Sequence, residues 1–136
     1  MLHRDELIRR LVEEWMRKAE EDIKAADALL SVEFPLLFPS CFHSQQAVEK
    51  YLKALLTLHQ VEFPRTHSIR ELLDLINTFD KNIASELQSA VSLTPYGVES
   101  RYPGDLPEPK LDETREALEI ARLVEKAVMN IIKTKT

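Results

Sequence analysis

Residues 3–31 constrain the fold more than any other part of the chain, because they repeat apolar side chains at the spacing of one helix face. With a rotation of about 100° per residue, Glu13, Arg17 and Lys24 fall on the opposite side. We therefore expect a long amphipathic helix that needs other helices to cover it. Its predicted apolar face consists of Leu7, Ile8, Leu11, Val12, Trp15, Ala19, Ile23, Ala26, Leu29 and Leu30.

The next two helices follow from periodicity and capping. A second helix is expected from about Ser40 to Gln60, after two prolines that break the first. Its apolar arc covers more than half of its circumference, so this helix should be central. Ser68 followed by Glu71 forms a capping box that starts a third helix, which carries Ile69, Leu72, Leu73 and Ile76.

The last third of the chain predicts two more helices and a loop. A short helix is expected near Asn82–Leu93, and residues 94–110 hold four prolines and both glycines, which indicates a long loop. Asp112 should cap the last helix. No segment shows the alternation of a strand. The sequence therefore predicts an all-α, up-and-down bundle of about five helices. The apolar stripe of the last helix is Ala117, Leu118, Ala121, Val124, Val128 and Ile131.

Length and composition set the protein class. The 136 residues, 44% hydrophobic and 30% charged, fit one globular domain that spans residues 1–136. A single cysteine, Cys41, excludes an internal disulfide and any cysteine-based zinc site. The net charge of −5 gives no sign of a general nucleic-acid binder. The charged N-terminus predicts no signal peptide, and no apolar run reaches the roughly 20 residues that span a bilayer. We expect a soluble cytoplasmic protein without a membrane partner.

Uncharged polar groups gather where the second helix begins. His43 and Gln46 lie beside a proline-bounded apolar segment, where a buried amide or imidazole needs a hydrogen-bond partner. These two side chains either bind a ligand or find their hydrogen-bond partners within the protein. Glu49 and Lys53, on the polar stripe opposite the leucines, are expected to form a solvated face.

Asp22 is predicted to lie on the buried face of the first helix. An ionised carboxylate in that position needs a cation or several hydrogen-bond donors. Lys50, Lys53 and Arg101 are candidates, and we expect a structural ion pair, either Asp22–Arg101 or Asp22–Lys50.

The long loop holds the remaining candidate groups. Arg101 offers a planar fork for phosphate or carboxylate, and Tyr96 or Tyr102 can stack on a base. The alternative is that Arg101 and Tyr102 only pin the loop to the bundle. We expect six side chains to converge on one side of the bundle. They form either a pocket for a phosphate-bearing ligand or a buried network in which they hydrogen-bond to one another. The six residues are His43, Gln46, Lys50, His67, Arg101 and Tyr102.

Three motifs in order, "CFHSQQAVEKYLKALL", "THSIRELL" and "ESRYPG", followed by an amphipathic helix, resemble the HEPN family (higher eukaryotes and prokaryotes nucleotide-binding domain). The resemblance covers nearly the full chain, and it implies a helical bundle that is commonly a homodimer. It also implies nucleotide binding, of an ATP-like or GTP-like ligand, and a separate minimal nucleotidyltransferase as partner, in a possible toxin–antitoxin-like pair. The chain is similar as well to the C-terminal helical domain of kanamycin nucleotidyltransferase.

Some HEPN proteins are metal-independent ribonucleases, in which four to six residues separate an arginine from a following histidine. Arg101 is followed at those positions by Leu106, Pro107 and Glu108, and His67 follows Arg65 too closely. The signature is therefore absent, and we predict no catalytic residue, metal or cofactor. Two alternatives stay open: an RNA-cleaving toxin, in which His43 or His67 meets Arg101 across space, and a purely structural dimerisation module.

Overall fold

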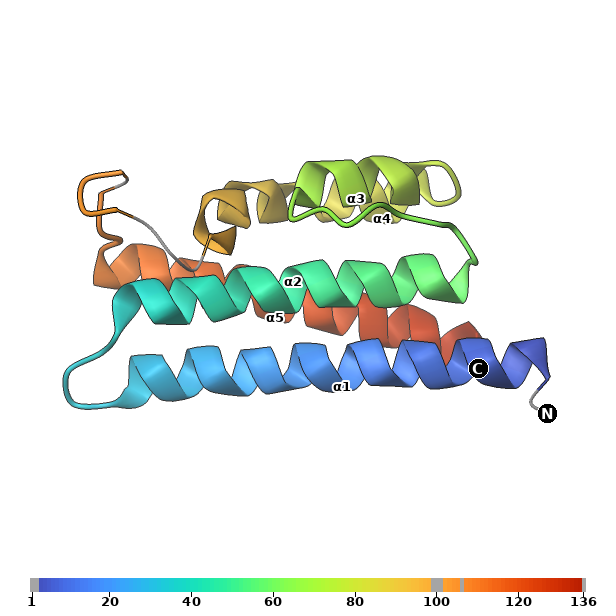
Figure 1. Ribbon diagram of the computed structural model, residues 1–136, viewed down its shortest axis with the longest axis horizontal. Helices are drawn as coiled ribbons and strands as arrows, with labels where there is room; N and C mark the ends of the chain where they lie inside the picture. Colours follow the sequence, from blue (N-terminus) through green and yellow to red (C-terminus); the bar gives the residue numbers. More distant parts are fainter. Residues whose placement is uncertain (1–2, 99–101, 106, 136) are drawn as a thin grey trace.

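The computed structural model describes residues 3–98, 102–105 and 107–135. These residues form five α-helices and one 3₁₀ helix, and no strand occurs among them (Figure 1). The fold is the all-α bundle that the sequence predicts. None of the described helices is long and apolar enough to cross a membrane. The elements are α1 (Arg4–Ser31), α2 (Leu37–Leu58), α3 (Ile69–Asn77), α4 (Lys81–Glu86), the 3₁₀ helix η1 (Gln88–Gly97) and α5 (Leu111–Lys135).

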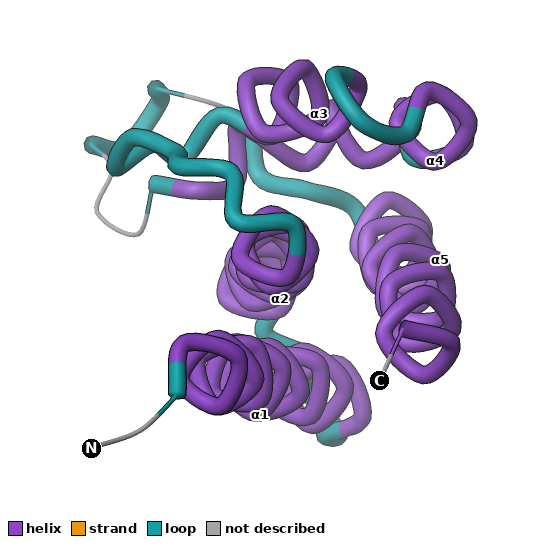
Figure 2. The backbone as a smooth tube through the Cα atoms, turned by 90° about the vertical axis from the view of Figure 1, so that its right-hand side faces the viewer, coloured by secondary structure: helices purple, strands orange, loops and turns teal. Residues whose placement is uncertain are grey.

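Helix α2 is the centre of the bundle, as its wide apolar arc predicts. Viewed along the helices, α1 lies below α2, α5 lies to its right, and α3 and α4 lie above (Figure 2). More than half of the residues of α2 are buried. Several of the largest fully buried side chains come from this helix, among them Tyr51, Leu52, Leu55 and Leu56.

The connector between α2 and α3 runs back over α2, so that α3 begins beside the middle of α2 (Figure 1). The Ser68 hydroxyl accepts the N–H of Glu71, which confirms the predicted cap. In a full capping box the Glu71 carboxylate would also accept the N–H of Ser68. Here the Thr66 hydroxyl lies between them: it accepts the N–H of Ser68 and donates to the Glu71 carboxylate. This turn fixes the position of His67.

Two predicted helix starts are wrong by a few residues. Helix α2 begins at Leu37 rather than Ser40, which places Pro39 in the first turn. Proline is tolerated there because the first N–H groups of a helix have no helical partner. Helix α5 begins at Leu111, so Asp112 lies inside the first turn and does not cap it. Its charge still interacts favourably with the helix N-terminus.

The predicted helix near Asn82–Leu93 is two elements. Helix α4 ends at Glu86, and η1 continues to Gly97, into the segment expected to be loop. The reason lies in the spacing of Leu87, Ala90 and Leu93, which are all buried. A 3₁₀ helix has three residues per turn, so it places all three on one face.

The predicted apolar face of α1 is only partly covered. Val12, Ala19, Ile23 and Ala26 are buried, but Leu7 and Leu11 are exposed. The expectation that the whole stripe packs inside is therefore wrong for the first turns of α1.

Candidate functional site

Asp22 of α1 holds two side chains of α2. Its Oδ1 lies 2.8 Å from Nδ1 of His43, and its Oδ2 accepts a hydrogen bond from Nζ of Lys50 at 2.5 Å. Asp22 is only 7% exposed. The side chains of His43 and Lys50 are 33% and 26% exposed. The structure thus contains the Asp22–Lys50 pair, whereas Arg101, the other expected cation, lies outside the described residues.

Glu49 is buried, so the expectation of a solvated face is wrong for this residue. Its Oε1 accepts from Nζ of Lys53 at 2.7 Å, and its Oε2 lies 3.1 Å from Nδ1 of His67. Glu49 precedes Leu56 by one heptad, and residues seven apart share nearly the same side of a helix. Burial therefore follows from the helix phase, and the neighbouring cations compensate for the buried charge.

Lys53 is also far from solvated, because its side chain is only 12% exposed. Its ammonium lies 5.6 Å from the ring centroid of Trp15 and 5.9 Å from that of Phe63. A cation over aromatic faces is stabilised by the ring quadrupole. The Glu49–Lys53 pair thus connects α2 to α1 and to the connector.

The surroundings of Glu49 act on its pKa in opposite directions. Burial by itself raises the pKa, but the hydrogen bonds from Lys53 and His67, together with the charge of Lys53, lower it by more. The net result is a pKa below the usual value of a glutamate. Glu49 is therefore more stable as a carboxylate in the folded protein than in the unfolded chain.

This shift predicts how stability depends on pH. A depressed folded-state pKa stabilises the fold above the unfolded-state pKa, and the stabilisation is lost as the pH falls through the folded-state pKa. We expect wild type to exceed Glu49→Gln in free energy of unfolding at neutral pH, with a gap that narrows below about pH 4.3. Urea unfolding from about pH 3 to pH 7 measures this. A gap that stays constant over the whole range would contradict it.

Gln45, which the sequence analysis did not single out, joins the polar groups to one another. It is fully buried, and its Nε2 donates to Glu49 at 3.1 Å and to the carbonyl oxygen of His67 at 3.3 Å. Its Oε1 accepts from Nε2 of Gln46 at 2.7 Å. The sequence does contain a signal for the burial of Gln45, because this residue precedes the core residue Leu52 by one heptad and so lies on nearly the same side of α2.

The same amide approaches the end of η1. A Cβ added at Gly97 would lie 2.9 Å from Nε2 of Gln45, closer than side chains normally pack. Glycine is therefore required for this approach. Gln45 thus connects α2, the connector and the segment that leads into the long loop.

The expected convergence is present in part. His43 and Lys50 share Asp22, while Gln46 and His67 both hydrogen-bond to Gln45. His43, Gln46 and Lys50 lie at spacings of three and four and so share one side of α2. We call these three residues the α2 polar edge.

Tyr102, the described one of the two loop residues, is not joined to this edge. Tyr102 is 82% exposed, and its backbone N–H donates to the Asp105 carboxylate at 3.0 Å. Among the described residues, no contact links its ring to the α2 polar edge. The expected position of Arg101 lies outside the described residues.

The α2 polar edge offers directed hydrogen-bonding groups. An ammonium has three N–H donors, and Asp22 takes one from Lys50, so two remain. His43 turns Nδ1 toward Asp22, which leaves Nε2 to contact a ligand. In the part of the chain that the structure describes, no group of three or more His, Cys, Asp and Glu could hold a metal ion.

Comparison with known proteins decides the family. The profile of the HEPN domain matches residues 12–132, which is most of the chain. The chain belongs to the HEPN family. The three sequence motifs that resemble this family fall on α2, at the start of α3, and between η1 and α5 in the sequence.

Solved structures and a curated relative agree with this membership. Similar structures are ST0689, an archaeal HEPN homologue (TM-score 0.69, 30% identity, covering 89% of this chain and 97% of that one), and TT1696 from Thermus thermophilus (TM-score 0.69, 26% identity, 88% and 96%). A protein of Methanocaldococcus jannaschii, named "Putative toxin MJ1304", is 29% identical over 131 residues, covering 88% of this chain and 84% of the relative.

Proposed function

We propose that this HEPN protein is a non-catalytic nucleotide-binding subunit that works with a separate, small nucleotidyltransferase chain. The observation that carries the proposal is the α2 polar edge. There the buried Asp22 fixes the direction of His43 and Lys50, while both side chains keep part of their surface exposed. The remaining N–H donors of Lys50 and Nε2 of His43 suit phosphate oxygens.

The connector before α3 and the long loop supply the rest of the proposed site. His67 lies at the same end of α2 and has a 73% exposed side chain. Arg101 provides a bidentate fork for phosphate, and Tyr102 a ring on which a base can stack. Because Asp22 and Glu49 already neutralise Lys50 and Lys53, we infer that Arg101 contributes the largest share of attraction for a triphosphate.

Thermal unfolding tests the proposal. An ATP-like or GTP-like nucleotide at 100 times its Kd should stabilise the fold by about 2.7 kcal/mol, which raises the Tm by several degrees. Arg101→Ala should remove the increase without lowering the Tm of the unliganded protein. Arg10→Ala removes the same charge from an exposed position near the start of α1 and should leave the increase intact. The absence of any increase with every nucleotide, alone or with the partner chain, would contradict the proposal.

A second candidate function is an RNA-cleaving toxin. The Asp22–His43 contact favours it, because a carboxylate at Nδ1 orients an imidazole for proton transfer at Nε2. A relative named as a toxin agrees with it. Metal-independent cleavage of single-stranded RNA that His43→Ala abolishes, and that His59→Ala at the other end of α2 retains, would establish this function in place of the first.

Both candidates are compatible with a homodimer, which the family resemblance implies. The exposed Leu7 and Leu11 at the start of α1, and the exposed Phe34 and Leu36 beyond its other end, each provide apolar surface for a second copy. Light scattering coupled to size exclusion should give twice the mass of one chain.

A further inference from the structure

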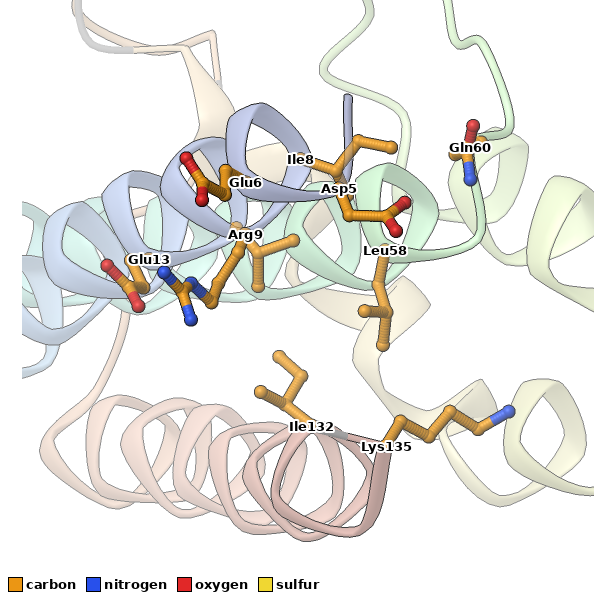
Figure 3. Close-up of a pocket in the computed structure, with 10 residues that line it drawn as sticks. Asp5, Glu6, Ile8, Arg9, Glu13, Leu58, Gln60, Ile132 and Lys135 are labelled. Carbon is orange, nitrogen blue, oxygen red and sulfur yellow. The ribbon is translucent and has the colours of Figure 1, made fainter. Parts of the chain in front are cut away.

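A groove runs between α1 and α5, whereas the α2 polar edge lies between α1 and α2. At one end of the groove the two helices are joined by Arg122 and Asp27, whose charged groups lie 3.6 Å apart. Toward the start of α1 and the end of α5 they leave a gap (Figure 3). Two adjoining hollows of about 650 and 510 Å³, which share Val12, Glu13 and Ile132, form the groove.

The base of the groove is apolar. Leu58 of α2 and Ile132 of α5 both point into the gap (Figure 3), and Tyr51 of α2 lines it further along. The two methionines of its lining, Met16 on α1 and the exposed Met129 on α5, have flexible side chains that adapt to a partner. Contiguous apolar surface of this kind marks a binding site.

The two walls carry opposite charge. The α1 wall carries four acidic residues and two arginines. One of the arginines, Arg17, already forms ion pairs with Glu14 and Glu21. On α5, Lys133 and Lys135 stand at the C-terminal end and form no ion pair with a described carboxylate. The one acid of this wall, Glu125, lies further from the C-terminus and accepts a hydrogen bond from the Tyr51 hydroxyl at 2.6 Å. The acids of the α1 wall are Asp5, Glu6, Glu13 and Glu20.

We propose that this groove binds an amphipathic α-helix of a partner protein, with basic side chains along α1 and acidic side chains toward the end of α5. From Asp5 to Glu20 the wall is about 22 Å long, which matches roughly four helical turns. Apolar anchors at positions i, i+3 or i+4, and i+7 of the partner would fill the base of the groove. The inference is independent of the proposed nucleotide site.

Two designed helical peptides of about 16 residues test the inference. Both carry leucines on one face; the first has arginines on the edge that would face α1 and glutamates on the other, and the second has glutamates on both edges, so that docking in the opposite direction does not restore the charge match. The chain holds only three methionines, so ¹³C-methyl spectra give direct signals from Met16 and Met129, with Met1 as reference. We expect the first peptide to shift both groove signals and to bind at least about tenfold more tightly, a difference of about 1.4 kcal/mol.

A pair of variants localises the binding. Met129→Glu should weaken the binding of the first peptide at least about tenfold, measured from the methyl signal of Met16. Leu123→Glu adds the same charge at an exposed leucine of α5 that does not line the groove, and it should leave binding unchanged. Circular dichroism establishes that both variants fold.

Three results with the peptides would overturn the inference. They are unchanged Met16 and Met129 signals at about 1 mM peptide, equal affinity for the two peptides, and equal weakening by the two variants. Shifts of both signals on raising the protein concentration alone would also overturn it, because they would assign the groove to a second copy of this chain.

Discussion

Replacing Glu49 with alanine is expected to lower the free energy of unfolding by about 3–5 kcal/mol, the usual cost of breaking a buried ion pair. The substitution leaves the ammonium of Lys53 without its carboxylate although its side chain is only 12% exposed. It also removes the acceptor that Gln45 and His67 share. Burial of an unpaired charge, rather than loss of an attraction, accounts for most of the expected effect.

Urea unfolding followed by circular dichroism measures this loss. Glu119→Ala removes an exposed carboxylate from α5 and should change the free energy of unfolding by no more than about 0.5 kcal/mol. The double variant Glu49→Leu, Lys53→Met should recover most of the loss, because apolar residues of similar volume can replace a buried pair. A loss below about 1 kcal/mol in Glu49→Ala would show that the pair is not desolvated in solution.

Replacing Leu55 with alanine should cost about 2–5 kcal/mol. Leu55 is fully buried on the central helix α2, so the cavity that remains cannot be filled from solvent and its walls relax only in part. The effect should be cooperative, with a single unfolding transition, since α2 packs on both α1 and α5.

Leu123→Ala on α5 is the matched control for this change, because it removes the same atoms from an exposed side chain. We expect its midpoint in urea to stay close to that of wild type. Equal losses in the two variants would contradict the central position of α2.

The helices that could be predicted are those whose apolar pattern matches the helix period over several turns. The stripe of α5 is confirmed at Ala117, Ala121, Val124 and Val128, which are all buried. Ser68 is confirmed as a cap because the capping interaction is local and needs no knowledge of the rest of the fold.

The errors arise where a local pattern does not determine the outcome. Periodicity shows which side of α1 faces inward, but not how much of that side is covered: Val12 is buried, whereas Leu7 and Leu11 are exposed. Residues three apart, such as Leu87, Ala90 and Leu93, also lie on one side of an α-helix. Their spacing therefore does not distinguish a 3₁₀ helix from an α-helix, and the 3₁₀ geometry was not predicted.

The candidate site was predictable to the same degree. The helix phase places Asp22 inside, and the same rule places Gln45 and Glu49 inside through their heptad partners. The contact of His67 with Glu49 could not be predicted, because it depends on the connector running back along α2. Sequence spacing alone does not determine that path.

The most direct test of the nucleotide site is histidine side-chain NMR during titration with ATP. The chain has four histidines, of which His43 and His67 lie at the proposed site. His59 stacks on Phe79 at the other end of α2, with ring centroids 4.0 Å apart, and serves with His3 as an internal reference. We expect the imidazole signals of His43 and His67 to shift together and saturate while those of His3 and His59 stay in place. Saturating ATP that moves neither His43 nor His67 would contradict a ligand site at the α2 polar edge.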